Sequence, residues 1–138
     1  MTHSEYEVVV ETKHSHLNNV ELLGYMDEAR FDWYMYCISL GVEALVVHMS
    51  TDFKKEVFNH DKILIRTWIE RVGNTSIALQ QKVVSEQNAH IASAQVILAT
   101  VDRQTRQKVT VPQEVRDLLV QQGVLDLNLL KLNSSFSS

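Results

Sequence analysis

Apolar residues recur at helical spacing between Asn19 and Leu40. Six of them follow one another at intervals of three or four residues: Leu22, Met26, Ala29, Trp33, Cys37 and Leu40. At about 100° per residue, this spacing places them on one stripe of an α-helix. Asn18 or Asn19 suits the N-cap, and Gly41 suits the position just past the helix end. The pattern therefore predicts one long helix over residues 19–40, with a strongly apolar face.

The segments on either side of this helix have the composition of β-strands. They are rich in β-branched residues, and turn signals such as Gly73-Asn74-Thr75 separate them. We expect strands at residues 5–12, 44–53, 62–72, 76–85 and 89–101. In the third strand, alternation puts Ile63, Ile65, Thr67 and Ile69 on one face. Pro112 then begins a short helix, predicted over residues 113–122 and ended by Gly123.

The order of strand, helix and four strands predicts an α+β fold, with a five-stranded antiparallel sheet wrapped around one long helix. We expect a single domain over residues 1–123 and a C-terminal tail, residues 124–138, that is partly docked or disordered. One helix covers only part of such a sheet. We therefore expect the remaining sheet face or edge to pair with another copy, which gives a homodimer or homotetramer.

Composition narrows the class of protein. The chain has 138 residues and a net charge of −4, and its lysines and arginines are scattered, which argues against nucleic acid as a partner. The single cysteine, Cys37, lies on the apolar stripe and is expected in the core. No apolar run approaches the roughly 18 residues of a membrane span, and no signal-peptide pattern is evident. We expect a cytoplasmic protein without a membrane span. His14 and His16 lack further ligands at metal-site spacing, so no metal is predicted.

One stretch carries a family resemblance. His16-Leu17-Asn18-Asn19 is followed by Asp27-Glu28-Ala29-Arg30 and an aromatic residue, and Gly73-Asn74-Thr75-Ser76 comes later. This ordered set resembles the 4-hydroxybenzoyl-CoA thioesterase-like acyl-CoA thioesterases. The resemblance implies the hotdog fold, hydrolysis of a thioester of CoA or of acyl carrier protein, and no cofactor, because the CoA moiety is part of the substrate.

The chain departs from the family at one important position. Many members carry an aspartate shortly before the asparagine pair, where it acts as nucleophile or general base. Aligned without gaps, that position falls at Thr12. A threonine hydroxyl without a base is a poor nucleophile. The departure leaves two hypotheses open: a thioesterase with a different catalytic group, or a non-hydrolytic acyl-CoA-binding protein that has lost the activity. A hotdog hydratase or dehydratase ranks last, because its characteristic pattern is not visible.

Four residues are candidates for the chemistry: Thr12, His16, Asn19 and Glu28. Free N–H groups at a helix start can hold an oxyanion, and the resemblance points to Asn19 for this role. His16 carries an imidazole, the side chain most often used as a general base, and the alternative is a structural histidine. In some hotdog thioesterases a helix carboxylate is catalytic, which suggests Glu28. The alternative for Glu28 is a solvated acidic face or a pair with Arg30 or Arg71.

The expected grip on CoA involves basic and polar groups. Lys54, Lys55 and Arg71 could meet the phosphates, and Ser76 could bond the pantetheine arm. Each also fits an ordinary surface or turn position. Asn18 is either a contact for the substrate or simply the cap of the helix. The acyl group cannot be read from the sequence.

Overall fold

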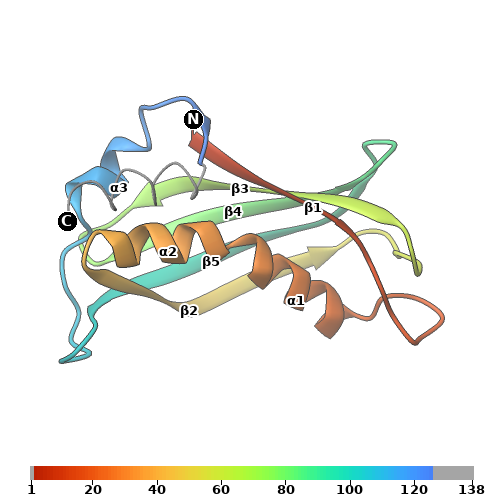
Figure 1. The fold of residues 1–138 in the computed structure, drawn as a ribbon, viewed down its shortest axis with the longest axis horizontal. Helices are drawn as coiled ribbons and strands as arrows, with labels where there is room; N and C mark the ends of the chain where they lie inside the picture. The colour runs from red at the N-terminus through yellow and green to blue at the C-terminus, as the bar shows by residue number, and fades with distance from the viewer. Residues whose placement is uncertain (1, 126–138) are drawn as a thin grey trace.

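A computed structural model describes residues 2–125. Strand β1 (Thr2–Val9) leads through a polar connector into helices α1 (Asn19–Ala29) and α2 (Phe31–Ser39). Strands β2 (Val42–Phe53), β3 (Lys62–Val72), β4 (Ser76–Ser85) and β5 (His90–Asp102) follow, and then α3 (Gln113–Asp117) and β6 (Gly123–Val124). Figure 1 shows α1 and α2 lying end to end across one face of the sheet. The α+β prediction is confirmed.

The strands form one sheet in the order β2-β5-β4-β3-β1-β6. All pairs are antiparallel except β1 with the two-residue β6, which is parallel. The sheet therefore has six strands where five were predicted, and the extra one, Gly123–Val124, spans the predicted boundary between the domain and the tail. The predicted inward face of β3 is confirmed, because Ile63, Ile65, Thr67 and Ile69 are all buried.

The predicted single helix is wrong in one respect: it is broken at Arg30. The N–H of Arg30 donates to the carbonyl of Asp27, three residues back, which tightens the turn at the end of α1. A new helix, α2, begins at Phe31. The apolar stripe nevertheless continues through the break, since Leu22, Met26, Ala29, Trp33 and Cys37 are all buried against the sheet. The stripe predicted which face is buried and could not predict the break.

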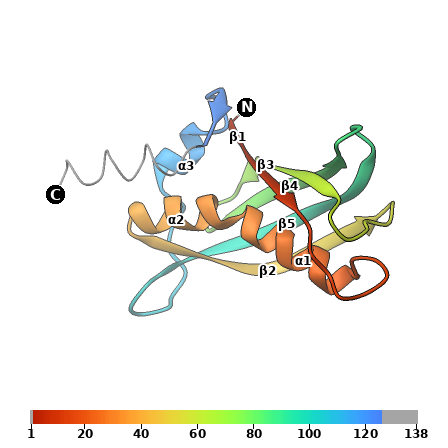
Figure 2. The ribbon, with the colours of Figure 1, turned by 45° about the vertical axis from the view of Figure 1, so that its right-hand side comes forward.

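The helix near the C-terminal end of the described residues is shorter than predicted. Helix α3 ends at Asp117 instead of residue 122. The chain then passes to β6, and Leu125 is buried and donates its N–H to the carbonyl of His3. Figure 2 shows α3 beside the start of β1, away from the amino end of α1. The rest of the predicted tail, residues 126–138, lies outside the described residues. None of the helices in residues 2–125 is long and apolar enough to cross a membrane.

Candidate active site

The start of α1 is held by a reciprocal pair of hydrogen bonds. The Asn18 side chain accepts from the N–H of Glu21 (2.8 Å), and the Glu21 carboxylate accepts from the N–H of Asn18 (3.1 Å). This is a capping box, which fixes the first turn and satisfies two backbone donors. The N–H groups of Asn19 and Val20 have no acceptor within the helix. They remain at the positive end of the helix dipole, where they can stabilise an anion. The predicted cap at Asn18 is confirmed.

Thr12 is tied to the same carboxylate. Its hydroxyl donates to Glu21 Oε1 (3.0 Å) and accepts from the N–H of His14 (3.2 Å). The N–H of Thr12 donates to the side-chain oxygen of Asn59 (3.0 Å), which comes from the loop between β2 and β3. The position that carries an aspartate in the resembling family thus carries a hydroxyl here. That hydroxyl has a carboxylate from the helix beside it.

Around this carboxylate lies a hollow that we call the connector cavity, of about 530 Å³. It is lined by Glu11, Thr12, Lys13, His14, Glu21, Asn59 and His60. The hydrogen bond from the backbone of Asn18 holds the pKa of Glu21 below its usual range, against a smaller opposing effect of desolvation. The hydrogen bond from Thr12 and the nearby histidines lower this pKa further. Glu21 is therefore ionised at neutral pH.

A second hollow, the lysine cavity, lies at the end of the connector nearest α1, at His16 and Leu17. It has a volume of about 290 Å³ and brings together three predicted residue groups: His16, Asn19 and the pair Lys54 and Lys55. The N–H groups of both lysines donate to the carbonyl of Ile91, which fixes this segment to the start of β5. Glu56 also lines this cavity, but the two lysines beside the helix start outnumber it and favour an anionic ligand.

Glu28 lies away from both cavities. It lies two turns of α1 after Glu21, and its Oε2 accepts a hydrogen bond from the hydroxyl of Tyr6 on β1 (2.7 Å). Burial raises the pKa of Tyr6 to about 12, and the carboxylate adds to this shift. The suggested pairs of Glu28 with Arg30 or Arg71 are wrong. Arg30 pairs with Asp27, and Arg71 pairs with Glu70.

Arg71 and Ser76 lie at the opposite end of the sheet from Asn19. Ser76 begins β4 and pairs with Ala99, near the amino end of β2. Its carbonyl accepts from the N–H of Gly73 (2.8 Å). A Cβ on Gly73 would come within 2.6 Å of the Ser76 hydroxyl oxygen, so glycine permits this turn. One subunit therefore does not bring Arg71 and Ser76 to the two cavities.

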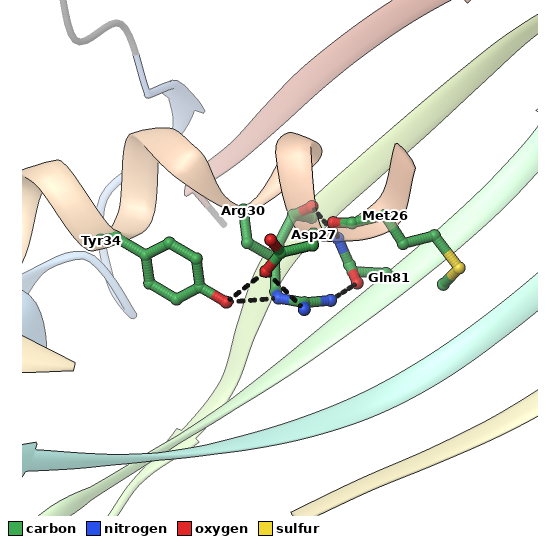
Figure 3. Close-up of polar contacts among 6 residues, drawn as sticks. Met26, Asp27, Arg30, Tyr34 and Gln81 are labelled. Carbon is green, nitrogen blue, oxygen red and sulfur yellow. Dashed lines mark hydrogen bonds and ion pairs between the residues drawn. The ribbon is translucent and has the colours of Figure 1, made fainter. Parts of the chain in front are cut away.

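The Asp27-Glu28-Ala29-Arg30 segment, which carries part of the family resemblance, has a structural role at its last residue. The side chain of Arg30 is 3% exposed and donates to Tyr34 OH (2.7 Å), Gln81 Oε1 (2.8 Å) and Asp27 Oδ1 (3.0 Å). Gln81 in turn donates to the carbonyl of Met26. Figure 3 shows this Arg30 network between the helices and the sheet. Every guanidinium nitrogen has an acceptor, which a buried charge requires.

Cys37 belongs to the core, as predicted. It lies on the buried face of α2, and burial raises the pKa of its thiol to about 11. A thiol with that pKa is protonated at neutral pH and is a poor nucleophile.

Glu21 and Asn59, which contact Thr12 in the connector cavity, were not predicted as site residues. Glu21 had a detectable signal, because Asn18 followed three residues later by a glutamate is a capping-box pattern. Asn59 had none, since it lies 47 residues from Thr12 along the chain.

Comparisons with known proteins bear on the family and the fold of the chain. A model of the thioesterase-like superfamily matches residues 13–119. The probable thioesterase YbaW from Escherichia coli has a TM-score of 0.72 and 19% identity, over 84% of this chain and 96% of that one. A 1,4-dihydroxy-2-naphthoyl-CoA thioesterase from Synechocystis has a TM-score of 0.72 and 20% identity, over 86% and 96%.

A hypothetical protein from Staphylococcus aureus, solved in complex with CoA, has a TM-score of 0.73 and 12% identity, over 86% of this chain and 82% of that one. At these identities, the similarities establish a shared fold, and the predicted hotdog fold is confirmed. No curated protein matches the chain at a significant level.

Proposed function

Because the chain belongs to the thioesterase-like superfamily, we propose that it hydrolyses the thioester of an acyl-CoA, or of acyl carrier protein, to a free acid and a thiol. The observation that carries the proposal is the start of α1. There, the N–H groups of Asn19 and Val20, which have no acceptor within the helix, lie where the connector forms two cavities. One cavity holds the ionised carboxylate of Glu21, and the other is lined by two lysines and one glutamate.

The helix start supplies electrophilic assistance. A thioester carbonyl placed at the N–H of Asn19 would develop negative charge on its oxygen when water attacks. Fixed donors aimed at that charge lower the barrier, and the loss of one such donor typically slows catalysis by about 10²- to 10³-fold. Asn18 supports this role by capping the turn, and His16 lines the same cavity as Asn19.

The proposed grip on CoA begins at Lys54 and Lys55. Their side chains can pair with phosphate oxygens at the mouth of the lysine cavity. Arg71 and Ser76 join this grip only if they come from a second copy of the chain. No cofactor is required, because the CoA moiety is part of the substrate.

Strand β2 supports a homodimer or a homotetramer. It forms one edge of the sheet in a single subunit, and Leu45, Val46 and Val47 on it are exposed. A long apolar edge is a template for pairing with another chain. Antiparallel pairing of two β2 edges about a two-fold axis sets the Phe53 end of one subunit beside the Val42 end of the other. That arrangement sets the sheet end that carries the β3–β4 turn of one subunit on the same side as the lysine cavity of the other.

The oligomeric state is tested by light scattering coupled to gel filtration. We expect the mass of a dimer or a tetramer for the native chain. Val47→Lys should shift it towards the monomer, because a lysine on the edge opposes strand pairing. A native chain that remains a monomer at micromolar concentration contradicts the proposed assembly.

The activity is tested with purified protein and a panel of acyl-CoAs, both aliphatic and aromatic, by detection of the released thiol. We expect turnover on at least one member. An absence of thiol release across the panel, together with tight binding of a CoA ester, supports instead the second candidate: a non-hydrolytic acyl-CoA-binding protein. The hydroxyl at Thr12 in place of the family's aspartate is the observation that favours this alternative.

A further inference from the structure

We propose that Glu21 is the catalytic carboxylate of this site, and that it acts as the general base that activates the attacking water. This inference rests on the proposed thioesterase function. It answers the question raised by Thr12: the carboxylate that the strand end lacks is supplied by the first turn of α1.

The contacts of Glu21 favour this role over a purely structural one. The Glu21 carboxylate accepts two hydrogen bonds, one from the N–H of Asn18 and one from the Thr12 hydroxyl, and both end on Oε1. Within residues 2–125, its other oxygen, Oε2, has no hydrogen-bond donor. One oxygen is therefore anchored and the other is unengaged, in a side chain that lines a cavity of about 530 Å³. A general base must come within hydrogen-bond reach of the proton that it abstracts, and the unengaged oxygen is the one that can accept a hydrogen bond from a water molecule.

Position along the helix supports the same conclusion. Glu21 is the third residue of the helix, so its carboxylate folds back to the N-cap beside the unpaired N–H groups of Asn19 and Val20. The Asn18 N–H that fixes the Glu21 carboxylate is one residue before those donors in the chain. Asn19 lines the lysine cavity and Glu21 lines the connector cavity, so a carbonyl held at the helix start lies where the two cavities adjoin the connector. Glu28 is about 10 Å further along the helix axis, at 1.5 Å per residue, and its Oε2 is engaged by Tyr6.

The reaction balances without any co-reactant. Glu21 takes one proton from water as the water oxygen bonds to the thioester carbon. The resulting tetrahedral oxyanion is held by the helix-start N–H groups. When the oxyanion collapses, the C–S bond breaks, and the proton on Glu21 passes to the leaving sulfur. The products are the carboxylic acid and the free thiol, and Glu21 returns to its ionised form.

The test compares Glu21→Gln with a matched control, Glu70→Gln. Glutamine at the third helical position can still complete a capping box, so the fold is preserved. Glu70 is likewise a carboxylate with a pKa lowered by hydrogen bonds, but it lies on β3 beside Gln95. On the best acyl-CoA of the panel, we expect Glu21→Gln to lower kcat by about 10²- to 10⁴-fold, with little change in KM. The control should retain the native kcat.

A second variant asks whether the carboxylate itself is what matters. In the double variant Thr12→Asp, Glu21→Gln, the hydrogen-bonded pair of residues 12 and 21 again contains one carboxylate, now at position 12 instead of position 21. We expect at least about tenfold of the lost kcat to be recovered. A double variant no faster than Glu21→Gln contradicts the proposal, because the loss would then come from altered contacts.

The outcomes separate this inference from the function on which it rests. If the native protein turns over no acyl-CoA, both fall. If the native protein is active and Glu21→Gln is equally active, only the role of Glu21 is overturned. The same holds if Glu28→Gln loses activity while Glu21→Gln keeps it.

Discussion

Two polar clusters lie at the two ends of α1, and they differ in what they leave unpaired. The Arg30 network at the carboxyl end is buried, and each guanidinium nitrogen donates to a protein oxygen. The Glu21 cluster at the amino end borders a cavity, and one carboxylate oxygen has no donor within the described residues. Both clusters involve several hydrogen bonds, so the number of bonds does not separate them.

The difference indicates what each cluster does. A buried charge must be fully hydrogen-bonded, because an unpaired one is very unfavourable. A group that acts on a substrate must instead retain capacity for a new partner. By this criterion Arg30 holds the helix break against the sheet, and Glu21 is available for chemistry.

The largest expected effect is on stability, at Arg30. Arg30→Ala leaves Gln81 Oε1 without its donor and opens a void beneath the helices, and should lower the free energy of unfolding by about 3 kcal/mol or more. Urea unfolding measures this loss. The control is Arg66→Ala, since the Arg66 side chain is half exposed and, among the described residues, its one ion pair is with Glu5 at 3.2 Å. This variant should lose less than about 1 kcal/mol. Equal losses in the two variants would mean that the buried network adds nothing.

The next effect is on the pH dependence of activity. Because the folded-state pKa of Glu21 is lowered, the carboxylate stays ionised until the pH falls below the ordinary value of 4.5. The acid limb of the kcat profile should therefore lie below pH 4.5 and be absent in Glu21→Gln. Stability follows the same sign. The hydrogen bonds of the ionised Glu21 carboxylate stabilise the fold above the unfolded-state pKa, and this stabilisation is lost as the pH falls through the lowered folded-state pKa. A limb near pH 6 to 7 that survives in Glu21→Gln would point to a histidine instead.

The smallest expected effect concerns a third polar pair on the same helix, Tyr6 with Glu28. This hydrogen bond is exposed, so Tyr6→Phe should change the free energy of unfolding by less than about 1 kcal/mol. Thermal unfolding of the two proteins at neutral pH gives the difference. A loss as large as that of Arg30→Ala would place the pair among the structural contacts of the fold.

Much of the fold could be predicted from periodicity. The limits of β3 and β4 agree with the predicted ranges, because turn signals bound both strands and one face is uniformly apolar. The break at Arg30 could not be predicted, since it depends on Gln81, which lies 51 residues away in the chain. Strand β6 was missed because two residues carry no periodic signal.

The site was only partly predictable. Asn18 and the helix start followed from capping rules, and the resemblance directed attention to Thr12. The partner of Thr12 required the fold, because the connector must turn back before its hydroxyl can meet Glu21 on the helix. Arg71 and Ser76 resemble residues of a binding site in sequence, yet a single subunit places them at the far end of the sheet.

The most direct test of the account is a crystal structure of the native chain with a non-hydrolysable thioether analogue of its best acyl-CoA substrate. We predict that the ketone oxygen of the analogue accepts hydrogen bonds at the N–H of Asn19, with a water molecule held by Glu21 near the carbonyl carbon. We also predict that the phosphates lie against Lys54 and Lys55. An analogue bound with its carbonyl beside Glu28, or away from the start of α1, would contradict the account.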